Sequence, residues 1–183
     1  MSPSDCSAPR RGWILLLTAL AIVVLLSNSR ATGAGEMTDS EKRTRVEALY
    51  AGYRKDFPGV PEIDSAEAMR LWEEGRAIFI DARSEPEQAV SMLPSAVPEQ
   101  EFLKDPTRYR DRVLIGYCTI SYRSGKLAQQ LAAQGIRILN LRGGMLGWVH
   151  AGGKIYDRNG ETHRLHVYGR KWDLAPREYQ TTW

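Results

Sequence analysis

One cysteine, Cys118, stands where its thiol could act as a nucleophile. It follows the short apolar run at 113–117, which reads as a buried strand, and it opens a polar loop that ends in Arg123. A helix is expected next, and the free amide N–H groups at a helix start, together with the charge of Arg123, favour an anion in the loop. The sequence therefore predicts a reactive thiolate at Cys118 rather than a small buried hydrophobe.

An alternation of helices and strands is needed to hold such a turn, and the chain has one. We expect a helix that is capped by Asp39 or Ser40 and stops at Pro58, and a second that is capped by Ser65 and ends at Gly75. The other expected elements are strands at 77–80, 113–117 and 136–141, a helix at 125–134, and short helical turns at 101–109 and 145–149. This order predicts an α/β fold, with a polar tail from 151 that stays unassigned.

Charged residues follow the strand at 77–80 without a gap. Asp81 and Arg83 stand at its carboxyl end, where open α/β sheets hold their sites, and Glu85 and Glu87 flank Pro86 as a helix start. Charged groups beneath a loop usually orient it through ion pairs and hydrogen bonds. Asp81 and Arg83 are therefore expected to support the Cys118 loop rather than to bind the substrate.

The N-terminal segment has the pattern of an export signal. Arg10 and Arg11 precede an uncharged apolar run at 13–26, and small polar residues follow it. The basic residues predict a cytoplasmic N-terminus with the rest of the chain outside, in the periplasm or another extracytoplasmic space. The run is at the upper limit for a signal peptide and below the ~20 residues that span a bilayer, so its length leaves cleavage open. If it is uncleaved, residues 13–29 would anchor the chain to the membrane.

Cysteine count and charge agree with this topology. Cys6 precedes the apolar run and Cys118 follows it, so export would separate the two thiols and leave Cys118 without a disulfide partner in its own chain. With 183 residues the chain fits one domain with appendages. Its net charge is +3, most of which lies in the N-terminal segment, and nothing in it indicates binding of nucleic acid.

Four segments in order resemble the rhodanese-like family of sulfurtransferases. They are IFIDAR at 78–83, LPSAV at 93–97, the CTISYRS loop at 118–124, and LRGG at 141–144 with Trp148. The resemblance covers roughly 63–153 and implies a small parallel sheet flanked by helices. It divides the chain into a signal peptide or anchor with linker at 1–35, an N-terminal amphipathic helix at 36–59, a rhodanese-like domain at 60–153 and a C-terminal tail at 154–183.

Three departures from the family pattern replace glycine or histidine. Ser91 and Met92 occupy the place of a Gly-His pair, Ser95 stands for a second glycine, and Ser121 stands in the loop where glycine is common. Glycine serves where the backbone takes a positive φ or approaches a ligand closely. Ser121 is therefore expected either to adopt a less favourable conformation or to tilt the ring of loop amides.

Loop length separates the nearest competing families. Protein tyrosine phosphatases and arsenate reductases with a related fold place five residues between cysteine and arginine, whereas four residues separate Cys118 from Arg123 here. The histidine expected before a phosphatase cysteine is replaced by Tyr117. The loop therefore resembles the sulfurtransferase form.

The resemblance implies a sulfurtransferase that carries sulfane sulfur on Cys118 as a persulfide. The donor would be a small anion such as thiosulfate, and the acceptor a thiol or cyanide. The residues expected to bind substrate are Thr119, Ile120, Ser121, Tyr122, Arg123 and Ser124. No cofactor or metal is implied, since His163 and His166 lack a third ligand. The alternatives are a non-catalytic rhodanese-like binding or sensing module, with a membrane or periplasmic protein as partner, and a phosphatase or arsenate reductase.

Overall fold

The computed structural model of the chain describes residues 36–183, so the predicted export segment at 1–35 lies outside the described residues. The helices are α2 (Asp39–Tyr53), α3 (Ser65–Glu73), α4 (Glu85–Val90), α5 (Glu99–Phe102), α6 (Tyr122–Ala132) and α7 (Gly144–His150), with 3-10 turns η1 (Arg54–Asp56), η2 (Pro106–Tyr109) and η3 (Arg170–Trp172). Within residues 36–183, no helix is both long and apolar enough to cross a membrane.

A parallel sheet of five strands organises the domain. Its order is β1-β5-β4-β2-β3, with strands β1 (Glu62–Ile63), β2 (Ala77–Asp81), β3 (Val97–Pro98), β4 (Val113–Tyr117) and β5 (Leu139–Leu141). The prediction of an α/β fold with a small parallel sheet flanked by helices is confirmed. Because β4 is the central strand, the residue that follows it, Cys118, lies at the middle of the carboxyl edge of the sheet.

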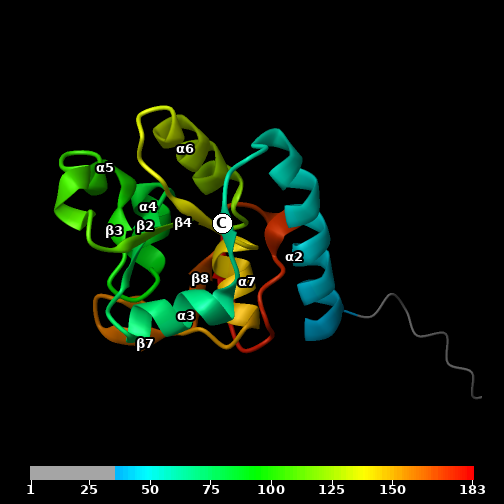
Figure 1. Cartoon of the computed structure of the whole chain (residues 1–183). Helices are drawn as coiled ribbons and strands as arrows, with labels where there is room; N and C mark the ends of the chain where they lie inside the picture. The colour runs from blue at the N-terminus through cyan, green and yellow to red at the C-terminus, as the bar shows by residue number, and fades with distance from the viewer. Residues whose placement is uncertain (1–35) are drawn as a thin grey trace, which may run out of the picture. The chain divides into compact units, whose positions relative to one another are not determined.

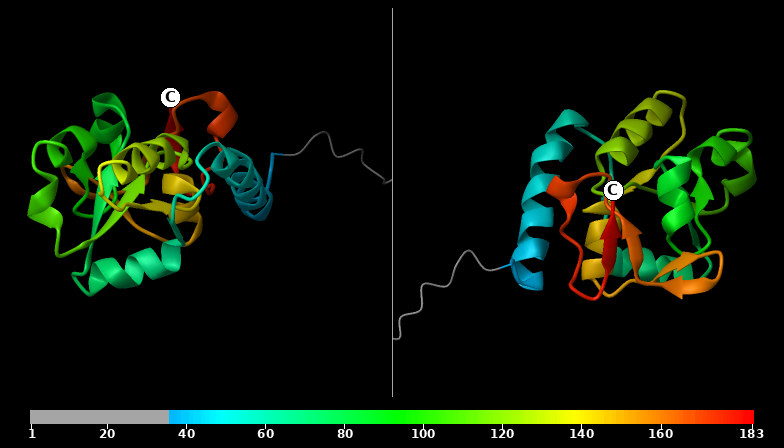
Figure 2. Two further views of the ribbon diagram at one scale, coloured as in Figure 1. Left: turned by 45° about the horizontal axis from the view of Figure 1, so that its top comes forward. Right: turned by 180° about the vertical axis from the view of Figure 1, so that it is seen from behind.

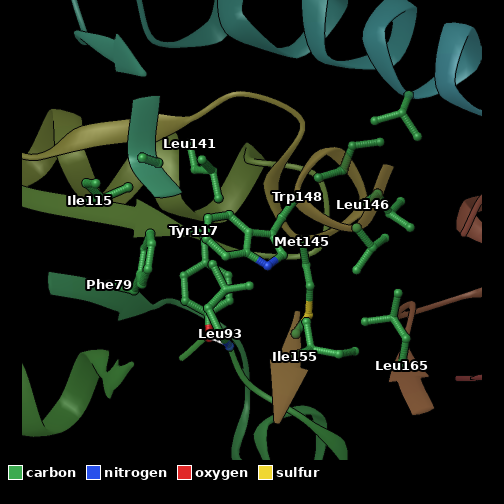
Figure 3. Close-up of a cluster of buried hydrophobic side chains, with 14 of the residues drawn as sticks. Phe79, Leu93, Ile115, Tyr117, Leu141, Met145, Leu146, Trp148, Ile155 and Leu165 are labelled. Carbon is green, nitrogen blue, oxygen red and sulfur yellow. Dashed lines mark hydrogen bonds between the residues drawn. The ribbon is translucent and has the colours of Figure 1, made fainter. Parts of the chain in front are cut away.

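Successive residues of the central strands point to opposite faces, and helices cover both faces. Phe79 and Ile115 pack with α3 and α7, while Ile80 and Leu114 pack with α5 and α6. Figure 1 shows α6 on one side of β4 and α3 with α7 on the other. In Figure 3 the Trp148 ring lies among the first set of side chains, and its centroid is 5.1 Å from that of Phe79.

Several predicted boundaries are wrong by one to three residues. Thr38 rather than Asp39 or Ser40 caps α2, and Asp64 rather than Ser65 caps α3, because these side chains accept the N–H groups of Glu41 and Glu67 respectively. Helix α6 starts at Tyr122 instead of at 125, so the second half of the Cys118 loop is its first turn. The strand predicted at 136–141 is shortened to Leu139–Leu141.

The N-terminal helix and the C-terminal tail pack on the same domain. Val46 and Tyr50 of α2 are buried, and the buried Lys42 donates from Nζ to the carbonyl oxygen of Ala175 at 3.0 Å. The tail holds a hairpin of β6 (Ile155–Asp157) and β7 (Gly160–Thr162) and a parallel pair of β8 (Arg164–His166) and β9 (Gln180–Thr182). Figure 2 shows this pair side by side, in orange and red in the right-hand view. Residues 37–183 are thus one compact unit.

Candidate active site

Cys118 lies in a tight turn between β4 and α6. Its side chain is buried, and it is the only cysteine within residues 36–183. Ser121 takes the left-handed conformation with φ 72°, and Ser95 does the same with φ 53°. Of the two outcomes expected for Ser121, the structure therefore shows the strained backbone, which two hydrogen bonds hold in place: Ser121 Oγ donates to the Leu141 carbonyl, and Asn140 Nδ2 donates to the Ser121 carbonyl at 3.1 Å.

Gly144 lets the backbone of α7 lie directly against the Cys118 loop. It has φ 56°, and a Cβ at this position would overlap the carbonyl oxygen of Cys118. The first turn of α7 then donates to the loop, from Met145 N to the Cys118 carbonyl at 2.9 Å and from Leu146 N to the Thr119 carbonyl at 3.1 Å. The Gly-Gly segment is thus the place where the loop is fastened to the domain.

This fastening determines which backbone groups of the loop stay free. In a trans peptide the N–H points opposite to the carbonyl, so the amides of Thr119 and Ile120 are directed away from α7. Among the described residues, no hydrogen-bond acceptor is found for the amides of Thr119, Ile120 and Ser121. Free amides next to a thiol, at the start of α6, can bind an anion carried on that thiol.

Arg123 is held by a carboxylate whose role the sequence reasoning missed. Its two terminal nitrogens donate to Glu87 Oε2 and Oε1, each at 2.7 Å. Glu87 also accepts from the Ser84 amide at 3.0 Å and from the Ser84 hydroxyl at 2.7 Å, which closes a capping box at the start of α4. The sequence indicated Glu87 only as a helix-start residue. Because a half-buried arginine needs a carboxylate partner, Arg123 was the signal that could have pointed to Glu87 as its ion-pair partner.

The charges of this pair are stabilised despite burial. Burial disfavours the carboxylate of Glu87, but the hydrogen bonds from Arg123 and Ser84 outweigh it and lower its pKa to about 2. Burial also disfavours the guanidinium of Arg123, yet its pKa is raised because of the Glu87 hydrogen bond and the attraction to Cys118. Arg123 therefore lies close enough to Cys118 to interact with it, and Glu87 is the ion-pair partner of its charge.

Asp81 and Arg83 form a sealed network beneath the loop. The register of the sheet sets Asp81 opposite Tyr117, whose hydroxyl donates to Asp81 Oδ2. Arg83 donates from Nη2 to Asp81 at 2.7 Å and to the Ser91 carbonyl at 2.6 Å, and the Leu93 amide donates to the Tyr117 hydroxyl at 3.2 Å. The pair thus connects β2, the end of β4 and the segment after α4, and it makes no contact with the Cys118 pocket.

Two of the predicted substrate-binding side chains point elsewhere. Ser124 is buried and its Oγ donates to Asn140 Oδ1 at 2.7 Å, and the Ser121 hydroxyl is occupied by Leu141. Both hydroxyls fasten the loop to β5, which leaves the backbone amide of Ser121 as the group of that residue that faces no partner among the described residues. Asn140 was not predicted from the sequence. Its Oδ1 accepts from Ser124 and its Nδ2 donates to the Ser121 carbonyl.

The other predicted residues come together around a pocket of about 390 Å³. Cys118, Thr119, Ile120, Tyr122 and Arg123 line it. Four further lining residues were missed because they come from α2 and from the tail that the sequence left unassigned: Tyr53, Tyr168, Lys171 and Trp172.

None of the three histidines lines this pocket, although His166 Nδ1 accepts from the amide of the lining residue Tyr168 at 3.0 Å. His150 contacts the Leu174 carbonyl through Nε2 at 2.7 Å, and His163 packs against the Tyr179 ring. Within the part of the chain that the structure describes, no three potential metal-ligating residues gather into a site.

Comparison with known proteins finds similar sequences and structures. Residues 64–151 match the rhodanese-like domain. A sulfurtransferase from Allochromatium vinosum is 35% identical over an alignment of 99 residues, which covers 51% of this chain and 92% of that protein. Among solved structures, a thiosulfate sulfurtransferase from Pseudomonas aeruginosa has a TM-score of 0.47 at 20% identity, over 66% of this chain and 23% of that one. A rhodanese-like domain protein from Staphylococcus aureus has a TM-score of 0.42 at 25% identity, over 49% and 91%.

Proposed function

The chain belongs to the rhodanese-like family, and from this membership we propose that it is a sulfurtransferase in which Cys118 carries sulfane sulfur as a persulfide. The observation that carries the proposal is the fastening of the loop. Because α7 binds the carbonyls of Cys118 and Thr119, the neighbouring amides are left for an anion on the Cys118 sulfur. A persulfide anion is the species that these free backbone amides would stabilise.

The first step loads the cysteine. The Cys118 thiolate attacks the outer sulfur of an anionic donor such as thiosulfate, a new S–S bond forms, and the donor's own S–S bond breaks. The electron pair of that bond leaves with sulfite. Arg123, fixed by Glu87, contributes a positive charge at the pocket without having to be ordered when the donor arrives.

The second step unloads it. An acceptor thiolate or cyanide attacks the outer sulfur of the persulfide, and Cys118 returns as the thiolate. Amides that are already in position for the persulfide also serve the returning thiolate, so neither step requires the loop to rearrange.

Mass spectrometry of the intact protein tests the proposal directly. After incubation with thiosulfate we expect the mass of one added sulfur atom on Cys118, and its removal by cyanide with formation of thiocyanate. Cys118→Ser should lose both signals, while Cys6→Ser, the matched control at the other cysteine, should keep them. A protein that takes up no sulfur and forms no thiocyanate would show that the domain binds or senses without catalysing transfer.

We also propose that the protein is exported and acts outside the cytoplasm. The support is the uncharged run at 13–26 behind Arg10 and Arg11. N-terminal sequencing of the protein from fractionated cells should find either a start near 30–35 in the soluble extracytoplasmic fraction or an intact N-terminus in the membrane fraction. Recovery of the intact chain in the cytoplasm would refute export.

A further inference from the structure

A second hollow lies at the opposite end of β4 from Cys118. It has a volume of about 640 Å³ and is lined by the segment that leads into β4 and by the segment that joins α6 to β5. Because the strands are parallel, both segments enter the sheet at its amino edge, whereas Cys118 follows β4 at the carboxyl edge. The hollow shares no lining residue with the Cys118 pocket, so the two are separate.

Three arginines line this hollow. Arg110 and Arg112 come from the segment before β4, and Arg137 comes from the segment before β5. Among the described residues none of the three forms an ion pair, and no carboxylate lines the hollow. Asp111 lies between two of them in the chain but is not part of the lining. Like charges that gather without a counter-charge repel one another, and an anionic ligand would remove this repulsion.

Backbone hydrogen bonds order the two segments that carry these arginines. The Ile136 amide donates to the Leu131 carbonyl at 3.0 Å, which closes the end of α6 just before Arg137. The Arg112 amide donates to the Tyr109 carbonyl at 3.0 Å, which closes the turn after η2. Both backbones are therefore in place before a ligand binds, and only side chains remain to be ordered.

The remaining lining is mainly aliphatic. The aliphatic side chains are those of Pro106, Val113, Leu114, Ile136 and Leu139. A planar guanidinium presents a fork of N–H donors that matches two oxygens of a phosphate group. Three guanidinium groups beside aliphatic side chains therefore suit a ligand that carries a phosphate dianion on an apolar body.

We propose that this hollow binds phosphate esters, with the phosphate against Arg110, Arg112 and Arg137 and the apolar body of the ester against the aliphatic side chains. The site is independent of sulfur transfer, because it lies at the other edge of the sheet and shares no residue with the Cys118 pocket. A soluble phosphate ester and the headgroup of a phospholipid offer the same chemistry, and the test distinguishes these two sources.

Isothermal titration calorimetry of the full chain with two monomeric probes tests the proposal. Phenyl phosphate represents a soluble ester, and dihexanoyl phosphatidic acid, used below its micelle concentration, represents a lipid headgroup. At least one probe should bind at low salt with a Kd below about 1 mM, and this Kd should rise with salt, since salt screens exposed charges. The probe that binds more tightly identifies the source.

Arg110→Gln and Arg137→Gln locate the bound phosphate. Each variant removes one exposed guanidinium, and each should raise the Kd of the probe by about tenfold. Arg112 is left unchanged because its Nη1 also donates to the Gly75 carbonyl, so its loss would remove a contact of the fold as well. The matched control is Arg158→Gln, which removes an exposed arginine from the turn between β6 and β7 and should leave the Kd unchanged.

The proposal is wrong if neither probe binds, or if Arg110→Gln and Arg137→Gln bind both probes as the wild type does. Loss of binding in Arg123→Met with an unchanged Kd in Arg137→Gln would place the phosphate at the Cys118 loop and would also refute the site. The sulfurtransferase function is tested apart from it, because Arg137→Gln should load sulfur on Cys118 as the wild type does.

Discussion

Two arginine–carboxylate pairs lie beside the Cys118 loop, and they differ in their access to water. The side chains of Asp81 and Arg83 are both 0% exposed, whereas Glu87 is 2% exposed and Arg123 is 32% exposed. The first pair connects strands and never reaches the pocket, while the second presents its arginine to the pocket from a buried carboxylate. The difference indicates that the sealed pair serves the fold and the half-open pair serves the site.

The largest effect is expected from breaking the sealed pair. Asp81→Ala leaves the buried charge of Arg83 without its partner, so the free energy of unfolding should fall by about 3–5 kcal/mol. Urea unfolding followed by circular dichroism measures the change. Glu67→Ala breaks the exposed pair with Arg70 and should cost less than ~1 kcal/mol. Equal losses in the two variants would remove the distinction between sealed and open pairs.

The half-open pair should appear in the acid dependence of stability. The pKa of Glu87 is about 2 in the folded protein and near its ordinary 4.5 when unfolded, so the charged form contributes stability above pH 4.5. This contribution, about 3 kcal/mol, is lost as the pH falls from 4.5 towards 2. Glu87→Gln lacks the titrating group, so the difference in unfolding free energy between wild type and variant should shrink over that range. A constant difference would mean that Glu87 is not stabilised as described.

A double-mutant cycle measures the Glu87–Arg123 interaction itself. Combining Glu87→Gln with Arg123→Met should reveal a coupling of about 1–2 kcal/mol, smaller than the full Glu87 contribution because Ser84 supplies the rest. Glu87→Gln alone should also reduce kcat/KM about tenfold, since Arg123 loses its fixed position. If the stability losses of the two single variants add up in the double variant and Glu87→Gln keeps the kcat/KM of the wild type, Arg123 does not act in the site.

A smaller effect than that of Asp81→Ala is expected at the edge of the sealed network. Tyr117→Phe removes one hydroxyl that donates to Asp81 and accepts from the Leu93 amide, at a cost of about 1–2 kcal/mol. Burial raises the pKa of Tyr117 well above 10, with the negative charge of Asp81 adding to the rise, so the hydroxyl keeps its proton. Sulfur transfer should persist in this variant, as measured by thiocyanate formation. A loss of activity comparable to that of Glu87→Gln would show that the sealed network also controls the loop.

Local patterns predicted the central strands of the sheet well, because their information is contained in short segments. The apolar run that became β4 is bounded as predicted, and the glycine argument at Ser121 anticipated its positive φ. The cap positions shifted by one residue, to Thr38 and Asp64, since neighbouring polar side chains compete for the same amides and only the backbone angle decides between them.

What the sequence could not predict depends on contacts between distant segments. Glu87 and Arg123 are 36 positions apart, and nothing in either local pattern pairs them. The strands of the tail are too short and polar for a periodic signal, yet their pairing brings Tyr168 and Trp172 to Cys118. The pocket residues that come from α2 and from the tail could therefore be identified only from the folded structure.

The anchoring of the tail has a practical consequence for protein production. Leu165, Val167 and Leu174 of the tail are buried in the same apolar cluster as Trp148, and Val46 of α2 belongs to it as well. Figure 3 shows Leu165 and Trp148 in this cluster. A recombinant fragment trimmed to the matched residues 64–151 would expose this apolar surface to water and would be prone to aggregate. An expression fragment beginning near 36 and running to Trp183 keeps the surface covered and retains the whole pocket.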